Sequence, residues 1–334
     1  MNKDCAFNLK PAVPVTIIGG YLGSGKTTLV NHILRNANGL RLAVLVNDFG
    51  ELPIDAELIE AQDGDVISLS GGCVCCSYGD DLSLALQKLL EQDIPAEQIF
   101  IEASGVAVPG AIGKSLSLLR AFRLEGIVVL ADVTTVQAAV DEKYIGDTVQ
   151  RQLRDADLIV LNKQDLLSMP ESVEVREWVN ERFNQARLVE AAFGRIPPEV
   201  LFGVGRSQRI LILDKNTPSA MAAGYPGAGV VNEFQLDETS LEHNVSKTFS
   251  TIKLEVDHSV DADALAASLA DKRCGLVRAK GFVMSHNNTL KTIQIVGRRW
   301  SVSDAPAGVK TGLVCIALSN DFSECMIRSV CKPG

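Results

Sequence analysis

The stretch Gly20-Tyr-Leu-Gly-Ser-Gly25-Lys26-Thr27 follows the apolar run Val15–Gly19 and opens a segment with helical spacing. It fits the pattern GxxxxGK[ST] in the strand–loop–helix context that this pattern requires. The glycines let successive backbone N–H groups turn toward phosphate oxygens, and the following helix adds its positive N-terminal end. Lys26 can supply a positive charge to the β- and γ-phosphates, and the Thr27 hydroxyl can bind Mg²⁺. The stretch therefore predicts a nucleotide-phosphate site; a glycine-rich turn without a ligand is the alternative.

On this interpretation the whole loop contributes to phosphate binding. The expected binding residues are Gly20, Gly23, Ser24, Gly25, Lys26, Thr27 and Thr28.

Around this loop, apolar runs alternate with helical patterns over the first two hundred residues. The expected strands are Val15–Gly19, Arg41–Val46, Val66–Leu69, Gln98–Glu102, Glu125–Ala131, Leu158–Leu161 and Arg187–Ala191. Helical spacing marks Thr27–Asn36, Asp80–Glu91 and Ser172–Phe183. Strands that are apolar throughout are typical of a sheet covered by helices on both faces. The pattern predicts an α/β fold of the P-loop NTPase type, with a mostly parallel, doubly wound sheet.

The alternation fades after about residue 205, and the chain is long enough for a second domain. Residues 216–231 are rich in glycine, alanine and proline and indicate a linker. Beyond it we expect a smaller α+β domain with one helix at Ala262–Ala270. Its expected strands are Thr248–Val256, Leu276–Met284, Thr292–Val296 and Leu313–Leu318. The predicted organisation is a nucleotide domain over 1–210, a linker over 211–246 and a C-terminal domain over 247–334.

A second motif, Asn162-Lys163-Gln164-Asp165, follows the apolar strand Leu158–Leu161. The pattern NKxD at a strand's end indicates recognition of guanine. The Asp165 carboxylate can accept hydrogen bonds from the N1–H and the amino group of guanine, whereas adenine offers neither donor. A buried carboxylate left without donors is strongly disfavoured. Downstream of a phosphate loop, the motif therefore predicts GTP rather than ATP; a helix N-cap is the alternative.

Acidic residues follow two further strands. Glu102 ends the strand Gln98–Glu102 and can serve Mg²⁺ through water or orient an attacking water molecule. Asp48, Glu51 and Asp55 follow the second strand, where nucleotide-sensing loops lie. They are candidates for Mg²⁺, for catalytic water or for a second metal, and an ordinary solvated acidic loop is the alternative. The catalytic candidates are thus Lys26, Glu102 and Asp48.

Three thiols crowd into Gly71-Gly-Cys73-Val-Cys75-Cys76. Thiolates converging on one ion suit Zn²⁺ or Cu(I), and Co²⁺ is also accepted. Three ligands leave a fourth position, which Glu51, water or a ligand from a partner could fill. A redox pair and a set of buried small side chains are the alternatives. The other cysteines, at 5, 274, 315, 325 and 331, are scattered, and we expect them to be packing residues or exposed thiols.

The overall composition excludes several classes of protein. The net charge of −9 argues against a duplex-binding protein, and no apolar run reaches the roughly 20 residues of a membrane helix. The N-terminal residues show no apolar signal core, and the cysteines do not form a secreted disulfide pattern. We therefore expect a cytoplasmic protein that binds neither nucleic acid nor membrane, and a homo-oligomer is left open.

Taken together, the motifs resemble the CobW-like GTPases, a metallochaperone branch of the P-loop GTPases. The resemblance rests on GGYLGSGKTTL (19–29), VNDFGE (46–51), GGCVCC (71–76), IEASG (101–105) and ADLIVLNKQDL (156–166), and continues into LVRAKGFV (276–283). It implies a GTPase of low intrinsic turnover whose nucleotide state controls a transition metal, usually Zn²⁺ or Co²⁺, held by the CxCC sulfurs. It also implies a client metalloprotein. Asp48 replaces the glutamate usual at this position, and the His-rich tract of many relatives is absent.

The leading hypothesis is therefore a Mg²⁺-dependent GTPase that delivers Zn²⁺ or Co²⁺ to a client protein or cofactor pathway. In this hypothesis Thr27 and Glu102 serve Mg²⁺, Asn162, Lys163 and Asp165 read guanine, and Cys73, Cys75 and Cys76 hold the transition metal, with Glu51 as a possible fourth ligand. The alternatives are a nucleotide-gated metal sensor without a client, a P-loop kinase of a small metabolite, and a thiol redox switch on a GTPase.

Overall fold

The computed structural model describes residues 12–37, 40–46, 66–70, 80–91, 96–202, 249–306, 308–318 and 324–331. The candidate residues Asp48, Glu51, Cys73, Cys75 and Cys76 lie outside these ranges, as do both expected linker boundaries. The chain divides near Leu201 into two compact units, each with its own sheet. None of the helices in the described ranges is long and apolar enough to cross a membrane.

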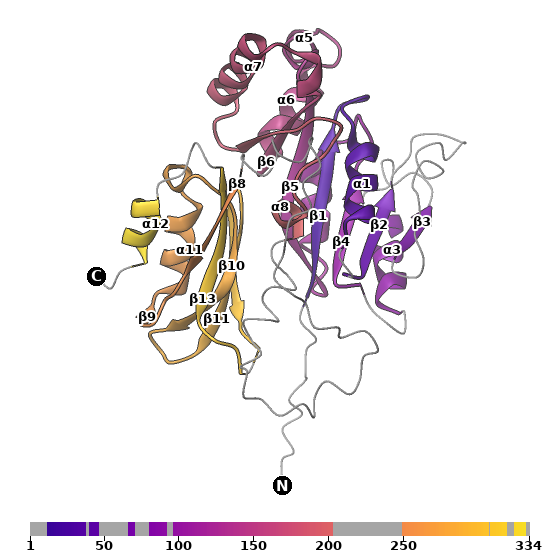
Figure 1. Cartoon of the computed structure of the whole chain (residues 1–334). Coiled ribbons are helices and arrows are strands. Elements are labelled where there is room, and N and C mark those ends of the chain that lie inside the picture. The colour runs from indigo at the N-terminus through magenta and orange to yellow at the C-terminus, as the bar shows by residue number, and fades with distance from the viewer. Residues whose placement is uncertain are drawn as a thin grey trace. The chain divides into compact units, whose positions relative to one another are not determined.

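The first unit is built on a seven-stranded parallel sheet with the order β3-β2-β4-β1-β5-β6-β7 in its described residues (Figure 1). The strands are β1 (Val13–Gly20), β2 (Leu42–Val46), β3 (Val66–Ser70), β4 (Gln98–Glu102), β5 (Phe122–Asp132), β6 (Leu158–Asn162) and β7 (Arg187–Glu190). The helices are α1 (Lys26–Arg35), α3 (Asp80–Leu90), α4 (Pro109–Leu116), α5 (Val136–Asp141), α6 (Gly146–Asp155), α7 (Met169–Arg182) and α8 (Pro198–Phe202).

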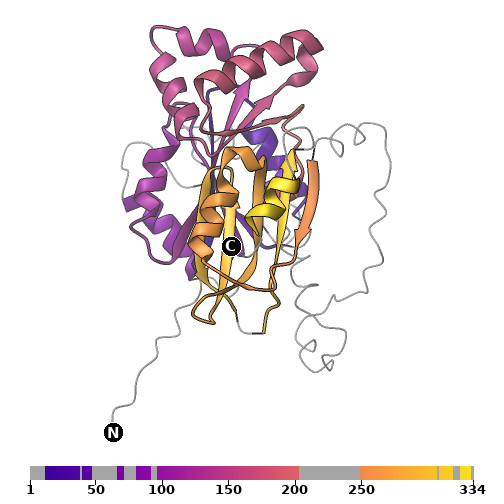
Figure 2. The same cartoon turned by 90° about the vertical axis from the view of Figure 1, so that its left-hand side faces the viewer.

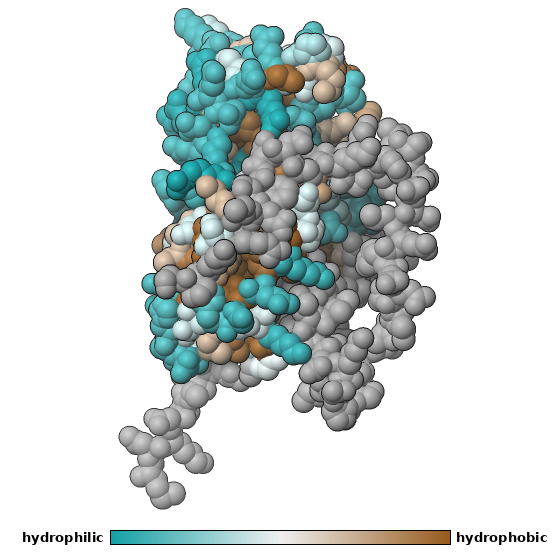
Figure 3. All heavy atoms as spheres, turned by 60° about the vertical axis from the view of Figure 1, so that its left-hand side comes forward, coloured by the Kyte–Doolittle hydropathy of each residue, from teal (hydrophilic) through white to brown (hydrophobic). Residues whose placement is uncertain are grey.

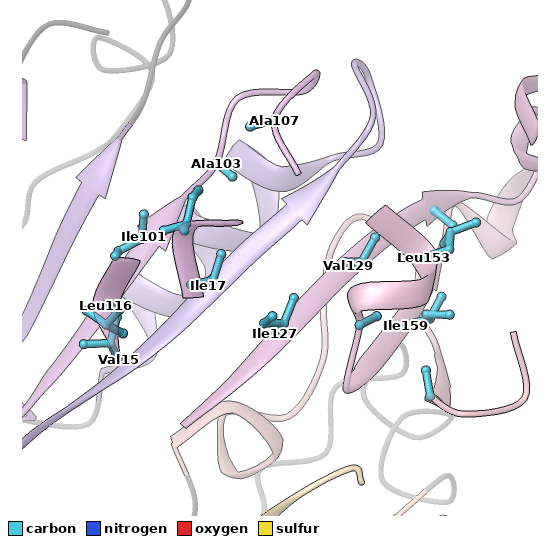
Figure 4. Packing of buried hydrophobic residues seen from close by; sticks show 14 of the residues in the cluster. Val15, Ile17, Ile101, Ala103, Ala107, Leu116, Ile127, Val129, Leu153 and Ile159 are labelled. Carbon is cyan, nitrogen blue, oxygen red and sulfur yellow. The ribbon is translucent and has the colours of Figure 1, made fainter. Parts of the chain in front are cut away.

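The core of this unit explains why the strands are apolar throughout. One face of the sheet packs, through side chains such as Ile17, Ile101 and Ile159, against buried residues of α3, α4, α6 and α7. Figure 4 shows part of this cluster, with Leu116 of α4 and Leu153 of α6. Helix α1 buries its own apolar side chains separately, at Leu29, Val30, Ile33 and Leu34. Because each central strand is covered by side chains on both faces, both of its alternating sets of residues must be apolar.

Local signals fix where the helices begin. Helix α1 starts directly after Gly25, whose φ of 99° is left-handed. Helix α7 starts with a capping box, in which Ser168 and Glu171 satisfy each other's backbone donors. It therefore begins at Met169, three residues before the predicted start. The outer surface over α5 and α7 is mainly hydrophilic (Figure 3).

The second unit carries an antiparallel sheet with the order β12-β11-β10-β13-β8, and a short β9 pairs with β10 in parallel. Its strands are β8 (Phe249–Leu254), β9 (Ser259–Val260), β10 (Leu276–Ser285), β11 (Leu290–Val296), β12 (Arg299–Asp304) and β13 (Gly312–Leu318). The helices α11 (Ala262–Ala270) and α12 (Glu324–Val330) pack together beside this sheet (Figure 2). The Asp261 side chain caps α11 by accepting from two backbone N–H groups.

The predicted fold class is confirmed: a mostly parallel, helix-covered sheet is followed by a smaller α+β unit with an antiparallel sheet. Strand β4 has the predicted bounds, and helix α11 matches its prediction as well. The helices α4, α5, α6, α8 and α12 and the strands β9 and β12 were not predicted.

Candidate functional site

The phosphate loop adopts a backbone that glycine alone enters easily. Gly20, Gly23 and Gly25 have φ angles of 135°, 75° and 99°. A Cβ at Gly20 would collide with the carbonyl of Leu130, and one at Gly25 would collide with the Asn162 amide. A Cβ at Gly23 would meet nothing within 4 Å. Close approach therefore requires glycine at 20 and 25, while position 23 requires it for φ alone.

Two side chains inside the loop are buried. Lys26, the first residue of α1, donates from Nζ to the carbonyl of Tyr21 at 3.2 Å, so the lysine folds over its own loop. The Ser24 hydroxyl is buried and has no hydrogen-bond partner among the described residues. A buried hydroxyl is unfavourable unless a polar group meets it. The chemistry of the loop therefore fits an anionic ligand, with backbone amides, a lysine and a hydroxyl available to it.

The next two positions of α1 differ in their surroundings. Thr27 is half-buried, and its hydroxyl donates to Oε1 of Glu102 at 2.9 Å. Thr28 is exposed. Because the Thr27 hydroxyl gives its proton to a carboxylate, its oxygen lone pairs can face a cation. A hydroxyl and a carboxylate are the hard oxygen donors that Mg²⁺ prefers, so this pair fits that ion.

Glu102 belongs to a row of residues at the carboxyl ends of neighbouring strands. It is 2% exposed and pairs in register with Ile18 of β1 and with Val46 of β2. Val46 in turn pairs with Ser70, the last residue of β3. The chain leaves β3 at Ser70 and reaches Cys73 three residues later. The cysteine segment thus departs from the same sheet edge, two strands from Glu102.

Asn162 ties the two predicted motifs together. Its Nδ2 donates to the carbonyl of Ser24 at 2.9 Å, and its Oδ1 accepts from the backbone N–H of Gly194 at 2.9 Å. The side chain is 2% exposed, so both bonds are shielded from water. It does not cap a helix, which was the alternative interpretation of this motif. One amide therefore joins the phosphate loop, the end of β6 and the segment after β7.

The remaining residues of this motif follow β6 directly. Lys163 has a left-handed backbone with φ of 66°, and its Nζ lies 2.6 Å from Oδ2 of Asp132. Asp165 lies in a short 3-10 turn, Gln164–Leu166, and is exposed. The structure thus joins Thr27 of the first motif to Glu102 and, through Asn162 and Ser24, joins the phosphate loop to the second motif. Asp165 is open to solvent.

Three residues beside the site have no sequence motif of their own. Asp132 ends β5, and Gly194 forms part of a tight turn with φ of 63° whose N–H meets Asn162. Gln152 of α6 is 1% exposed and donates from Nε2 to the carbonyls of Gly105 and Ala107, in the segment after Glu102. Only the position of Asp132 at the end of an apolar strand could have singled one of them out.

His32 has a structural role in α1. Its Nε2 lies 2.9 Å from the carbonyl of Ile196, and burial, with a smaller effect from Arg195 and Arg35, lowers its pKa. Within the described ranges, no group of three or more His, Cys, Asp or Glu side chains is arranged to hold a metal ion.

Known protein families match both units. A family model of the CobW/HypB/UreG nucleotide-binding domain matches residues 14–190, more than half of the chain. The chain belongs to this CobW/HypB/UreG family. A model of the cobalamin synthesis protein CobW C-terminal domain matches residues 249–327. This member of the CobW family is therefore a P-loop GTPase, as its motifs predict.

Curated relatives carry related names. The CobW-family chain is 28% identical to the zinc chaperone CobW of Sinorhizobium sp, over 95% of this chain and 96% of the relative. It is 36% identical to zinc-regulated GTPase metalloprotein activator 1 of Schizosaccharomyces pombe, over 55% of this chain and 47% of the relative. The crystal structure of Zn(II)-bound YjiA GTPase from E. coli superposes with a TM-score of 0.41 at 23% identity, covering 96% and 98% of the two chains. The family assignment rests on the two family models.

Proposed function

We propose that this chain is a GTP-hydrolysing metallochaperone. It binds Zn²⁺ or Co²⁺ through Cys73, Cys75 and Cys76 and delivers the ion to a client metalloprotein under control of the bound nucleotide. Membership of the CobW family supports the GTPase part. The names of the relatives, zinc chaperone and metalloprotein activator, support the metal and the client.

In this proposal the phosphates of GTP lie in the loop between β1 and α1. The amides around Gly23 and Gly25, together with the N-terminus of α1, face the phosphate oxygens, and Lys26 turns from the Tyr21 carbonyl to the β- and γ-phosphates. Thr27 and Glu102, whose side chains are hydrogen-bonded, would hold Mg²⁺. The ion, when bound, neutralises charge on the β- and γ-phosphates.

The base lies at the ends of β6 and β7. Asp165 is exposed, so its carboxylate can accept from both guanine donors without the cost of burying an unpaired charge in the free protein. Asn162 does not touch the base in this scheme. It keeps the phosphate loop and the 162–165 segment at a fixed separation, because its amide bonds to Ser24 and Gly194.

One observation supports coupling between nucleotide and metal most directly: Ser70, Val46 and Glu102 form one row of register partners. Strands lie about 4.8 Å apart, so the backbone of Ser70 is roughly 10 Å from that of Glu102. The cysteine segment follows Ser70, and the segment containing Asp48 and Glu51 follows Val46. Both segments leave the sheet beside the carboxylate assigned to Mg²⁺.

A change at the γ-phosphate can therefore act on both segments over a short distance. The nucleotide can shift metal binding only if the metal has different affinities for the GTP and GDP states. We infer that GTP favours the metal-holding arrangement, with Glu51 or a water molecule as the fourth ligand. Asp48 positions the attacking water, and hydrolysis in the client complex releases the metal.

The test is a metal titration of the reduced, metal-free protein against a competing chelator. Zn²⁺ and Co²⁺ are titrated in the presence of Mg²⁺ with a non-hydrolysable GTP analogue, and then with GDP. We expect the metal affinity to differ by at least about tenfold, which corresponds to a coupling of about 1.4 kcal/mol.

The variant C73S/C75S/C76S should lose both the tight metal binding and its dependence on nucleotide. Cys5→Ser, which removes a thiol outside the motif, is the matched control and should behave as the wild type. Metal binding that ignores the nucleotide, or that survives loss of the three thiols, would contradict the proposal. Stimulation of GTP turnover by a metal-free client would separate a chaperone from a metal sensor that has no client.

A further inference from the structure

An ion pair joins the ends of two neighbouring strands beside the proposed base site. Nζ of Lys163 lies 2.6 Å from Oδ2 of Asp132. Asp132 ends β5 and is the register partner of Asn162 on β6, so the pair spans adjacent strands at the carboxyl edge. The side chains are 33% and 13% exposed, respectively, so the contact is partly shielded from water.

Hydrogen bonds from Thr134 orient the carboxylate of Asp132 independently of Lys163. Its Oδ1 accepts from the backbone N–H of Thr134 at 2.9 Å and from the Thr134 hydroxyl at 2.7 Å. Oδ2 is left directed at Lys163. Burial alone would raise the pKa of Asp132, but the hydrogen bonds from Lys163 and Thr134 outweigh it and lower the pKa. The carboxylate is therefore ionised at neutral pH and held in one orientation.

The backbone at Lys163 is also held in place by its neighbours. Lys163 has φ of 66°, a conformation that side chains other than glycine, asparagine and aspartate rarely adopt. Both of its neighbours are anchored: Asn162 by its two side-chain bonds, and Gln164 by its N–H, which donates to the carbonyl of Ala191 at 3.1 Å. An unusual backbone that its surroundings hold in place points to a functional demand on the side chain.

We propose that Asp132 is a positioning residue for guanine nucleotides. It holds the Lys163 ammonium so that the hydrocarbon stem of this lysine lines the binding site of the guanine base. This inference rests on the proposed GTP site and deepens it. A lysine stem has four rotatable bonds, and ordering it upon binding would cost conformational entropy. An ion pair that orders the stem beforehand removes that cost from the binding step.

A second lysine–aspartate ion pair has an aspartate that is neither shielded from water nor bonded to a described backbone donor. In the second unit, Nζ of Lys291 on β11 lies 2.7 Å from Oδ1 of Asp304, the last residue of β12. The Asp304 side chain is 88% exposed, and no backbone donor to it is described. Asp304→Asn therefore removes an ion pair of matching length and is the control for charge loss alone.

The experiment is a double-mutant cycle on nucleotide affinity. A fluorescent GDP is titrated into the full chain with Mg²⁺, as the wild type, Asp132→Asn, Lys163→Met, the double variant and Asp304→Asn. Methionine keeps an unbranched, apolar side chain and removes the ammonium. We expect Asp132→Asn to weaken affinity about 3- to 10-fold when Lys163 is present, and by less than about twofold when it is added to Lys163→Met. Asp304→Asn should leave the affinity unchanged.

The results that would overturn this role of Asp132 differ from the result that would overturn the proposed GTP site. An equal loss of affinity in both backgrounds, with a lowered Tm of the nucleotide-free protein, would make Asp132 a fold element and overturn the inference. Wild-type affinity in Asp132→Asn would overturn it as well. If the wild type itself prefers no guanine nucleotide over adenine nucleotides, the proposed function fails and this inference fails with it.

Discussion

The two units place their reactive side chains in opposite settings. In the first unit, Glu102, Asp132 and Asn162 each end a parallel strand and meet hydrogen-bond partners from other segments. In the second unit, Cys274, Cys315 and Cys331 are buried in an apolar cluster formed by the sheet and its helices. The same chain thus carries polar groups at a sheet edge and thiols inside a core.

The difference shows how strongly the position of a reactive group in the fold limits what it can do. Burial, with a smaller contribution from Cys331 and Cys274, raises the pKa of Cys315 to about 12. A thiol in that state is neither a ready nucleophile nor a ready metal ligand. A strand end in a parallel sheet instead faces loops that a ligand can enter. Of the two expectations for the scattered cysteines, packing residues or exposed thiols, these three follow the first.

The largest effect that tests this comparison comes from two glycines, one in each unit. Gly20→Ala would drive a Cβ into the Leu130 carbonyl at a φ of 135°, and we expect a loss of about 3 kcal/mol or more in unfolding free energy, together with loss of nucleotide binding. Gly281→Ala would collide with the backbone at Gly312 and should destabilise the second unit while nucleotide affinity is retained. Urea unfolding and nucleotide titration measure both.

Gly23→Ala is the control, because a Cβ there meets nothing and only the left-handed φ opposes it. Its cost should be near 1 kcal/mol. If Gly281→Ala abolished nucleotide binding as Gly20→Ala does, the separation of roles between the units would be wrong.

A smaller effect is expected from buried polar residues at the two ends of the sheet. Asn162→Ala removes two buried hydrogen bonds that hold the nucleotide edge, and it should lower nucleotide affinity about 10- to 30-fold. Gln98→Met, at the amino end of β4, removes the buried bond from Gln98 Nε2 to the Thr16 hydroxyl. It should lower Tm and change affinity by less than about twofold. Similar affinity losses in both variants would mean that strand-end position has no special role.

The smallest effect concerns the buried thiols. With its pKa near 12, Cys315 is about one part in ten thousand thiolate at pH 8. Alkylation of the folded protein by iodoacetamide should therefore leave Cys315 unmodified at pH 8, and its rate should rise about tenfold per pH unit until the fold is lost. Mass spectrometry of peptides reads this out, and unfolded protein is the control. Rapid labelling of Cys315 in folded protein would place it in a polar or open environment.

Much of the nucleotide unit was predictable because its strands are apolar throughout and its motifs stand directly at strand ends. β4 was predicted residue for residue, and the order strand–loop–helix located Lys26 and Thr27. Helices α4 and α6 were not predicted. α4 contains Gly110 and Gly113, which lower its helical signal. Glycine is needed at these two positions because added Cβ atoms would collide with the side chains of Asp155 and Leu124. α6 is polar along most of its length, and its buried Gln152 breaks the apolar stripe.

The contacts of Asp132 and Gly194 could not be predicted in the same way. Each contact joins residues about 30 positions apart in the sequence. Asp132 faces Lys163 only because β5 pairs with β6 in one specific register. Gly194 meets Asn162 only because the segment after β7 turns back over the end of β6. Sequence motifs are defined by spacing along the chain, whereas these contacts depend on which segments lie side by side in the fold.

The central claim is that the carboxyl edge of the parallel sheet reads guanine through Asp165, and one exchange of base tests it most directly. Asp165→Asn keeps an oxygen that can accept from N1–H but replaces the second acceptor with an N–H donor. Xanthine has N1–H and a carbonyl in place of the amino group of guanine, so it complements asparagine. Titration of GDP and XDP into wild type and Asp165→Asn should show a preference for GDP of at least about 100-fold that reverses in the variant. Equal loss of both nucleotides, or an unchanged preference for GDP, would contradict the account.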